Sequence, residues 1–139
     1  MERSKSQERE RTIFLAVLNN EIEKSLEVWR ETGSHYCDEK IRLNVLIHLA
    51  EELGSGFLVK IPLDSKLGDE ITTITAYAGK ICTKATDGLV LTIPSASERR
   101  TQHEREMKIK IGDDYLDLES SKGTEARIWR GAVLSIEAR

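Results

Sequence analysis

Residues 54–61, Gly-Ser-Gly-Phe-Leu-Val-Lys-Ile, mark the point at which the sequence changes from a helical to a strand pattern. Before Gly54, apolar residues recur at steps of three and four, the spacing of one helix face. After Gly56, the pattern has a period of two, and β-branched residues become common. The two glycines therefore separate a helical N-terminal part from a β-rich C-terminal part of the 139-residue chain.

Two helices are predicted between Gln7 and Leu53. The first is ended by Gly33, and the second is preceded by Asp38 as a candidate N-cap and closed by Gly54. The apolar stripe of the first comprises Ile13, Phe14, Val17, Leu18, Ile22, Leu26 and Trp29, with Leu15 near its edge. That of the second comprises Ile41, Val45, Leu49 and Leu53, widened by Leu46 and Ile47.

The part after Gly56 predicts antiparallel strands joined by short turns. A strand is expected at 57–63, and Pro62 within it places it at an edge or an end. A turn at 67–69 leads to a long β segment, 70–85, bent at Gly79. The remaining expected elements are a hairpin turn at Thr86-Asp87-Gly88, a strand at 89–93, a polar loop or extended hairpin tip at 95–106, strands at 107–111 and 115–118 joined by a turn at 112–114, a turn at 120–123, and a strand at 126–138 bent at Gly131.

The predicted fold class is α+β, with two N-terminal helices followed by a five- or six-stranded, strongly bent antiparallel sheet or small barrel. Residues 1–55 form the helical region and 56–139 the barrel, and the length suits one compact unit. Because the helical stripes are wide, we expect the helices to cap the barrel or to pair with another chain. A homo-oligomer, most simply a dimer, is the expected form.

Composition excludes several classes of protein. The chain is 39% hydrophobic and 32% charged, with a formal net charge of -3. Its apolar content is too high for a disordered chain, and no apolar run approaches the roughly 20 residues of a membrane helix. Residues 1–12 are charged and unlike a signal peptide, so the expected location is the cytoplasm, away from membranes.

Few residues suggest catalysis or metal binding. His35-Tyr36-Cys37-Asp38 brings imidazole, thiol and carboxylate together, but the further Cys or His pair of a structural zinc site is missing. Neither Cys37 nor Cys82 stands in a recognisable nucleophile motif, and Cys82 suits a small core position. We therefore predict no catalytic residue, no metal and no cofactor, although an enzyme is not excluded.

The segment 97–106 contains Arg99, Arg100 and Arg105, whose guanidinium groups suit phosphate oxygens. Three glutamates in the same segment cancel this charge. The segment can therefore be interpreted either as a solvated loop or as an anion-binding loop.

Two short motifs resemble the signatures of Sm-like proteins. Residues 77–81, Tyr-Ala-Gly-Lys-Ile, followed by 87–91, Asp-Gly-Leu-Val-Leu, are similar to the first signature, and 128–136, Ile-Trp-Arg-Gly-Ala-Val-Leu-Ser-Ile, is similar to the second. The chain departs from the family at Gly88, where an asparagine is usual, and at Ala132-Val133, where Asp-Asn is common. The spacing between the two motifs is also longer than in the family.

The resemblance implies a small Sm-like or SH3-like barrel that assembles through its edge strands into a ring or dimer. It also implies single-stranded RNA held at Arg130-Gly131 and at Asp87-Gly88, where bases stack on a guanidinium plane and bond to turn backbone. Arg130 is expected to point outward, opposite an inward Trp129, while Arg99, Arg100 and Arg105 add nonspecific attraction. The alternative hypothesis is a regulatory or assembly module that binds a protein partner through its helices and a sheet edge.

Overall fold

The computed structural model describes residues 5–33, 38–62 and 72–139, and the backbone of Cys37. The predicted turn at 67–69, the start of the segment 70–85, and His35 with Tyr36 lie outside the described residues. Helix α1 spans Lys5–Thr32 and helix α2 spans Cys37–Glu52. As predicted, each helix is followed by a glycine in the left-handed region, Gly33 with φ 52° and Gly54 with φ 78°. Asp38 lies in the first turn of α2 rather than before it.

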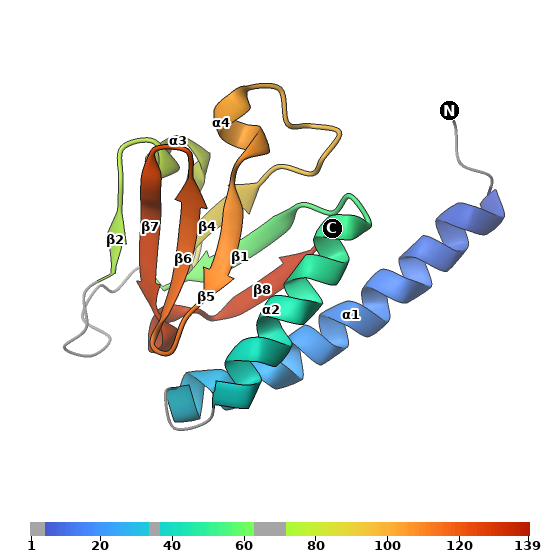
Figure 1. Cartoon of the computed structure of the whole chain (residues 1–139), viewed down its shortest axis with the longest axis horizontal. Coiled ribbons are helices and arrows are strands. Elements are labelled where there is room, and N and C mark those ends of the chain that lie inside the picture. The colour runs from blue at the N-terminus through green and yellow to red at the C-terminus, as the bar shows by residue number, and fades with distance from the viewer. Residues whose placement is uncertain (1–4, 34–36, 63–71) are drawn as a thin grey trace.

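Two four-stranded antiparallel sheets follow the helices, which confirms the α+β class (Figure 1). The first sheet has the order β3-β4-β1-β8, and the second has the order β2-β7-β6-β5. The strands are β1 (Phe57–Ile61), β2 (Thr73–Ile74), β3 (Cys82–Ala85), β4 (Gly88–Ile93), β5 (Lys108–Ile111), β6 (Tyr115–Ser120), β7 (Gly123–Trp129) and β8 (Ser135–Ala138). In the described chain no helix is long and apolar enough to span a membrane.

Several hairpins agree with the sequence. Ala85 pairs with Gly88 across the predicted turn at Thr86-Asp87. Strand β6 pairs back on β5 after the turn at 112–114, and β7 pairs back on β6 after Ser120. Local turn chemistry was therefore a sound guide where two strands are neighbours in sequence.

Three expectations differ from the structure. The described residues form eight strands rather than five or six, and neither sheet closes on itself. The segment 70–85 is not one long strand, because after β2 the chain turns at Thr75 into the short helix α3 (Ala78–Ile81), which contains Gly79. The segment 95–106 is not only a loop, since it contains helix α4 (Gln102–Arg105), whose N-cap Thr101 accepts a hydrogen bond from the backbone N–H of Glu104.

Helix α1 buries most of its predicted stripe, whereas α2 buries a face that shares only Ile47 with the predicted one. In α1 the buried apolar side chains are Leu15, Leu18, Ile22, Leu26 and Trp29, while Ile13, Phe14 and Val17 are exposed. In α2 the buried side chains are Leu43, Ile47 and Ala50, while the predicted stripe of Ile41, Val45 and Leu49 is exposed. Both helices carry apolar residues on two faces, so periodicity alone could not identify the one that faces the sheets.

Asparagine side chains fix the helices against two sheet edges. On α1, the Asn19 Nδ2 donates to the carbonyl of Ala138 at 3.0 Å, and the N–H of Ala138 donates to Asn19 Oδ1 at 2.7 Å. On α2, Asn44 makes the same two bonds with Ile111, each 2.9 Å long. Ala138 and Ile111 belong to β8 and β5, which are edge strands of the two sheets. The helices thus occupy the edges whose pairing would be needed to close a barrel.

The chain passes from one sheet to the other through a short 3-10 helix, η2 (Arg130–Ala132), between β7 and β8. A β-carbon on Gly131 would overlap the Trp129 ring, so the indole packs directly on this glycine. Val133 and Ala132 are buried in the core that the helices and both sheets share. The bend predicted at Gly131 is therefore a helical turn between two strands.

Candidate functional site

Arg130 is held within the structure rather than presented to solvent. Its Nε donates to Asp114 Oδ1 at 3.3 Å, and its Nη1 donates to the carbonyl of Arg30 at the end of α1. The side chain also lies across Gly33, where a β-carbon would collide with it. Arg130 therefore links η2 to the C-terminal end of α1, in contrast to the outward orientation expected from strand alternation.

The three arginines of the segment 97–106 have different environments. Arg99 donates from Nε to the carbonyl of Pro94 at 2.9 Å and from Nη1 to that of Met107 at 3.1 Å, so it holds the ends of the segment together. Arg100 and Arg105 have exposed side chains. Of the predicted arginines, these two are the ones available to an incoming anion.

Asp87 and Gly88 lie in the β3–β4 hairpin. The Asp87 carboxylate is 3.9 Å from Lys60 Nζ on β1, and Gly88 packs against the backbone of Ile61. These neighbours differ from those of Arg130, which are Asp114 and Arg30. The two halves of the predicted nucleic-acid site are thus held by different parts of the molecule.

A buried histidine–glutamate pair is the most unusual polar feature of the core. Glu125 is 4% exposed and His103 is 8% exposed, with His103 Nε2 3.3 Å from Glu125 Oε1. The Thr75 hydroxyl donates to Glu125 at 2.6 Å and the Ser120 hydroxyl at 2.8 Å, while the Tyr77 ring lies 3.5 Å from that of His103 between centroids. The pair joins α4 to β7, β6 and the turn before α3.

A β-bulge explains why the carboxylate points inward. Leu118 pairs with Ala126 and Glu119 pairs with Thr124, so Glu125 is an extra residue in β7. The hydrogen bond from Thr75, that from Ser120 and the nearby His103 lower the pKa of Glu125, which keeps the carboxylate charged. Because both members are buried among core residues, we interpret the contact between His103 and Glu125 as structural.

The cysteines and histidines form no reactive cluster in the described chain. Among the described residues no group of three or more His, Cys, Asp or Glu side chains could hold a metal ion. Burial raises the pKa of the Cys82 thiol, which disfavours the nucleophilic thiolate. His35, Tyr36 and the side chain of Cys37 lie outside the described residues.

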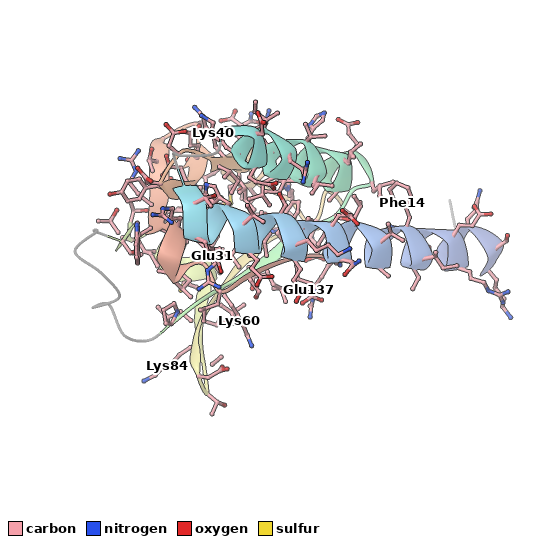
Figure 2. The ribbon with its side chains drawn as sticks, turned by 90° about the horizontal axis from the view of Figure 1, so that it is seen from below. Phe14, Glu31, Lys40, Lys60, Lys84 and Glu137 are labelled. Atoms are coloured by element: carbon pink, nitrogen blue, oxygen red, sulfur yellow. The ribbon has the colours of Figure 1, made fainter. Side chains whose placement is uncertain are left out.

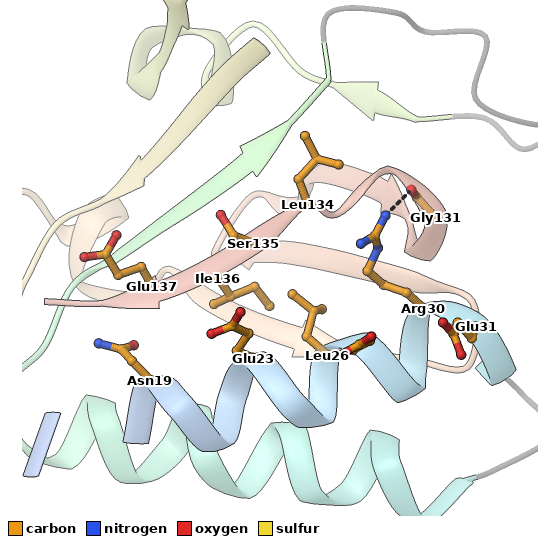
Figure 3. Close-up of a pocket in the computed structure, with 11 residues that line it drawn as sticks. Asn19, Glu23, Leu26, Arg30, Glu31, Gly131, Leu134, Ser135, Ile136 and Glu137 are labelled. Atoms are coloured by element: carbon orange, nitrogen blue, oxygen red, sulfur yellow. Dashed lines mark hydrogen bonds between the residues drawn. The ribbon is translucent and has the colours of Figure 1, made fainter. Parts of the chain in front are cut away.

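A groove of about 700 Å³ runs between α1 and β8 (Figure 3). Leu26, Leu134 and Ile136 contribute apolar surface to it. Its carboxylates are Glu23, Glu27 and Glu31 on α1 and Glu137 on β8, and Arg30 contributes the one guanidinium of its lining. Sequence reasoning missed this groove, although the spacing of four residues between the three helix glutamates predicts a single acidic stripe.

The two helices also carry exposed apolar side chains away from the sheets. They are between 39% and 60% exposed, and we refer to them as the exposed helix stripes: Ile13, Phe14, Val17 and Val28 on α1, and Ile41, Val45 and Leu49 on α2. The N-terminal turns of α1, beyond Phe14, extend past the rest of the molecule (Figure 2). Sequence analysis placed most of these residues on the apolar stripes of the helices, which it expected to meet the barrel or another chain.

Together the fold and these surfaces define a small α+β protein whose prominent features are an acidic groove and an apolar helix surface. Comparison with protein-family models, with curated proteins and with solved structures gives no match for this chain.

Proposed function

We propose that this protein is a noncatalytic assembly module that forms a homodimer through the exposed helix stripes. The observation that carries the proposal is the exposure of seven large apolar side chains on the two helices. Apolar side chains gathered in this way are typical of surfaces that bind other proteins.

A second copy of the chain suits this surface better than a strongly charged partner. The polar residues on the helices beside the stripes carry both signs of charge, as in the 3.7 Å pair between Lys24 and Glu21 and the 3.0 Å pair between Arg42 and Glu39. A surface with apolar residues and balanced charges can pack on its own copy about a twofold axis. Four helices, two from each chain, would then bury the stripes against each other.

The test is the mass of the protein in solution, measured by light scattering and sedimentation velocity from about 1 to 100 μM, a range in which dimers of ordinary affinity dissociate. We expect a dimer in the upper part of this range and a monomer for the double variant Val17→Glu with Val45→Glu. Both sites are exposed, and glutamate favours helix more than valine does, so the variant monomer should fold.

The matched control is Ala16→Glu with Thr83→Glu, which adds the same two carboxylates at exposed positions outside the stripes, one on α1 and one on β3. It should dimerise like the wild type. A wild-type chain that stays monomeric up to 100 μM with normal helix content by circular dichroism would refute the proposal. Equal dissociation of both double variants would attribute the effect to charge rather than to the stripes.

Single-stranded nucleic acid binding, which the Sm-like resemblance implies, is the second candidate. In its support, Arg100 just before α4 and Arg105 at the end of α4 expose their side chains. Strand β7 also runs through η2 into β8, so the two sheets can be regarded as halves of one strongly bent, incomplete barrel. We expect Arg100→Ala with Arg105→Ala to weaken binding of a short single-stranded RNA, measured by fluorescence anisotropy at low salt. The exposed pair Lys80→Ala with Lys84→Ala is the control, and absence of binding by the wild type at millimolar RNA would exclude this function.

A further inference from the structure

We propose that the groove between α1 and β8 binds an extended, lysine- or arginine-rich segment of a partner protein. The groove uses the side of α1 that faces β8, where Asn19, Glu23 and Leu26 lie in Figure 3. It is therefore a different surface from the exposed helix stripes.

The floor of the groove is apolar. Leu26 and Ile136 are almost fully buried at its base, and Leu134, which is 40% exposed, adds apolar surface beside them. The long methylene stems of lysine and arginine can lie on such a floor while their charged ends reach its rim.

The rim of the groove carries more negative than positive charge, with four carboxylates and one guanidinium group in the lining. Glu23, Glu27 and Glu31 follow one another at intervals of four residues, and Glu137 comes from the facing strand. Within the described residues none of these four carboxylates forms an ion pair, whereas Glu21, on another side of α1, pairs with Lys24. Arg30 is the single cation of the lining, and its Nη2 donates to the carbonyl of Gly131 at 3.3 Å. Charge complementarity therefore requires a positively charged occupant.

The edge strand β8 forms one wall of the groove and directs backbone N–H and C=O groups toward it. Asn19 bonds to Ala138 on the side of β8 that faces away from β1. Since alternate residues of a strand direct their N–H and C=O groups to the same side, Ile136 directs its own toward α1 and the groove. An extended segment is the form of chain that can meet such groups while placing basic side chains at regular intervals.

The arrangement of the carboxylates favours basic side chains over a metal ion. A divalent cation needs several oxygen ligands at one point. These carboxylates instead follow one another along the helix, and no metal-holding cluster is found in the part of the chain that the structure describes. A row of separate carboxylates matches a row of separate cationic side chains.

The experiment measures binding of a fluorescein-labelled decapeptide with alternating lysine and valine by anisotropy at about 50 mM salt, where screening is weak. A peptide with glutamate in place of lysine is the ligand control. The protein variants are Glu23→Gln with Glu27→Gln, and the matched pair Glu10→Gln with Glu21→Gln, which removes the same charge from the same helix outside the groove. Glutamine keeps the length and nearly the helix propensity of glutamate.

We expect the wild type and the matched control to bind the basic peptide with affinities within twofold of each other, and the groove variant to bind it about tenfold more weakly. On binding, the amide signals of Leu134 and Ser135 should shift in NMR spectra. Equal weakening by both pairs would assign the binding to general attraction and overturn the proposal. Failure of the basic peptide to bind at millimolar concentration would also overturn it.

Two outcomes would identify a different occupant. If spermine binds with the same dependence on Glu23 and Glu27 and the peptide does not, the occupant is a small polyamine, and the proposal of a protein segment is wrong. If the groove variant instead converts a wild-type oligomer into monomers, the occupant is a second copy.

Discussion

The side chain of Asn19 and the backbone of Ala138 form a closed pair of hydrogen bonds, with the amide donating to the carbonyl at 3.0 Å and accepting from the N–H at 2.7 Å. The amide thus satisfies both backbone groups of one residue, as a neighbouring strand would. Ala138 is buried and lies in an edge strand of its sheet. Since unpaired strand edges are prone to pair with other chains, this contact protects β8 as well as fixing α1.

We expect Asn19→Ala to destabilise the protein by about 1–3 kcal/mol, the cost of leaving buried backbone groups without partners. Asn19→Asp should be at least as destabilising, because a carboxylate cannot donate to the carbonyl of Ala138. Urea unfolding followed by circular dichroism measures both. The neighbouring variant Asn20→Ala, at an exposed position of the same helix, is the control. A loss for Asn19→Ala no larger than that of the control would show that the pair contributes little.

Asn44 and Ile111 predict a local effect at the edge of the other sheet. Both backbone groups of Ile111 bond to the Asn44 side chain at 2.9 Å. In Asn44→Ala the amide of Ile111 should exchange with solvent deuterium much faster, because its acceptor is gone. The exchange rates of amides at the centre of β6, such as that of Leu118, should change only as much as the global stability changes. Unchanged protection at Ile111 would mean that another group takes over the bond.

Sequence patterns identified the elements that depend on neighbours in sequence and missed those that depend on distant contacts. The helix ends at Gly33 and Gly54 and the hairpin at Thr86-Asp87 are local features, and they were predicted correctly. The rotation of α2 depends on the bonds of Asn44 to Ile111, 67 residues away, and no periodicity contains that information. Helix α4 had a local signal that was overlooked, the Thr101-x-x-Glu104 pattern of a capping box.

The candidate sites follow the same division. The nucleic-acid residues were selected by local resemblance, whereas the contacts of Arg130 with Asp114 and Arg30 come from the packing of η2 against α1. The acidic stripe of the groove is local to α1, but its facing residue, Glu137, lies more than 100 residues further along the chain. Only the fold shows that the two parts meet.

Gly131 and Gly79 provide a matched pair of glycine substitutions. A β-carbon on Gly131 would overlap the Trp129 ring, while one on Gly79 would meet nothing within 4 Å. We expect Gly131→Ala to lower the free energy of unfolding by about 1–3 kcal/mol, the usual cost of overpacking. Gly79→Ala should be neutral or slightly stabilising, because Gly79 lies in helix α3 and alanine is the better helix former. Thermal unfolding of the two variants side by side tests this, and equal effects would contradict the packing of Trp129 on Gly131.

The lowered pKa of Glu125 predicts how the stability of the protein depends on pH. Its pKa is lowered in the folded protein, chiefly by the hydrogen bond from Thr75, with help from Ser120, His103 and Lys122. A carboxyl group with a lowered folded pKa stabilises the protein fully above its unfolded pKa, which is near 4.5, and this contribution is lost as the pH falls through the folded value. The wild type should therefore lose this contribution to stability as the pH falls below about 4.5 and through the lowered folded pKa.

The variant Glu125→Gln cannot undergo this titration. At pH 7 it should be less stable than the wild type by about 2 kcal/mol, the scale of hydrogen bonds to a charged group. As the pH falls below 4.5, the unfolded wild type takes up a proton at Glu125 before the folded wild type does, so the difference between the two proteins should shrink and disappear below the lowered folded pKa. Urea unfolding at several pH values gives both curves, and Glu10→Gln, which removes an exposed carboxylate from α1, corrects for the change in net charge. A difference that stays constant from pH 7 to pH 3 would show that the carboxylate charge of Glu125 does not stabilise the fold.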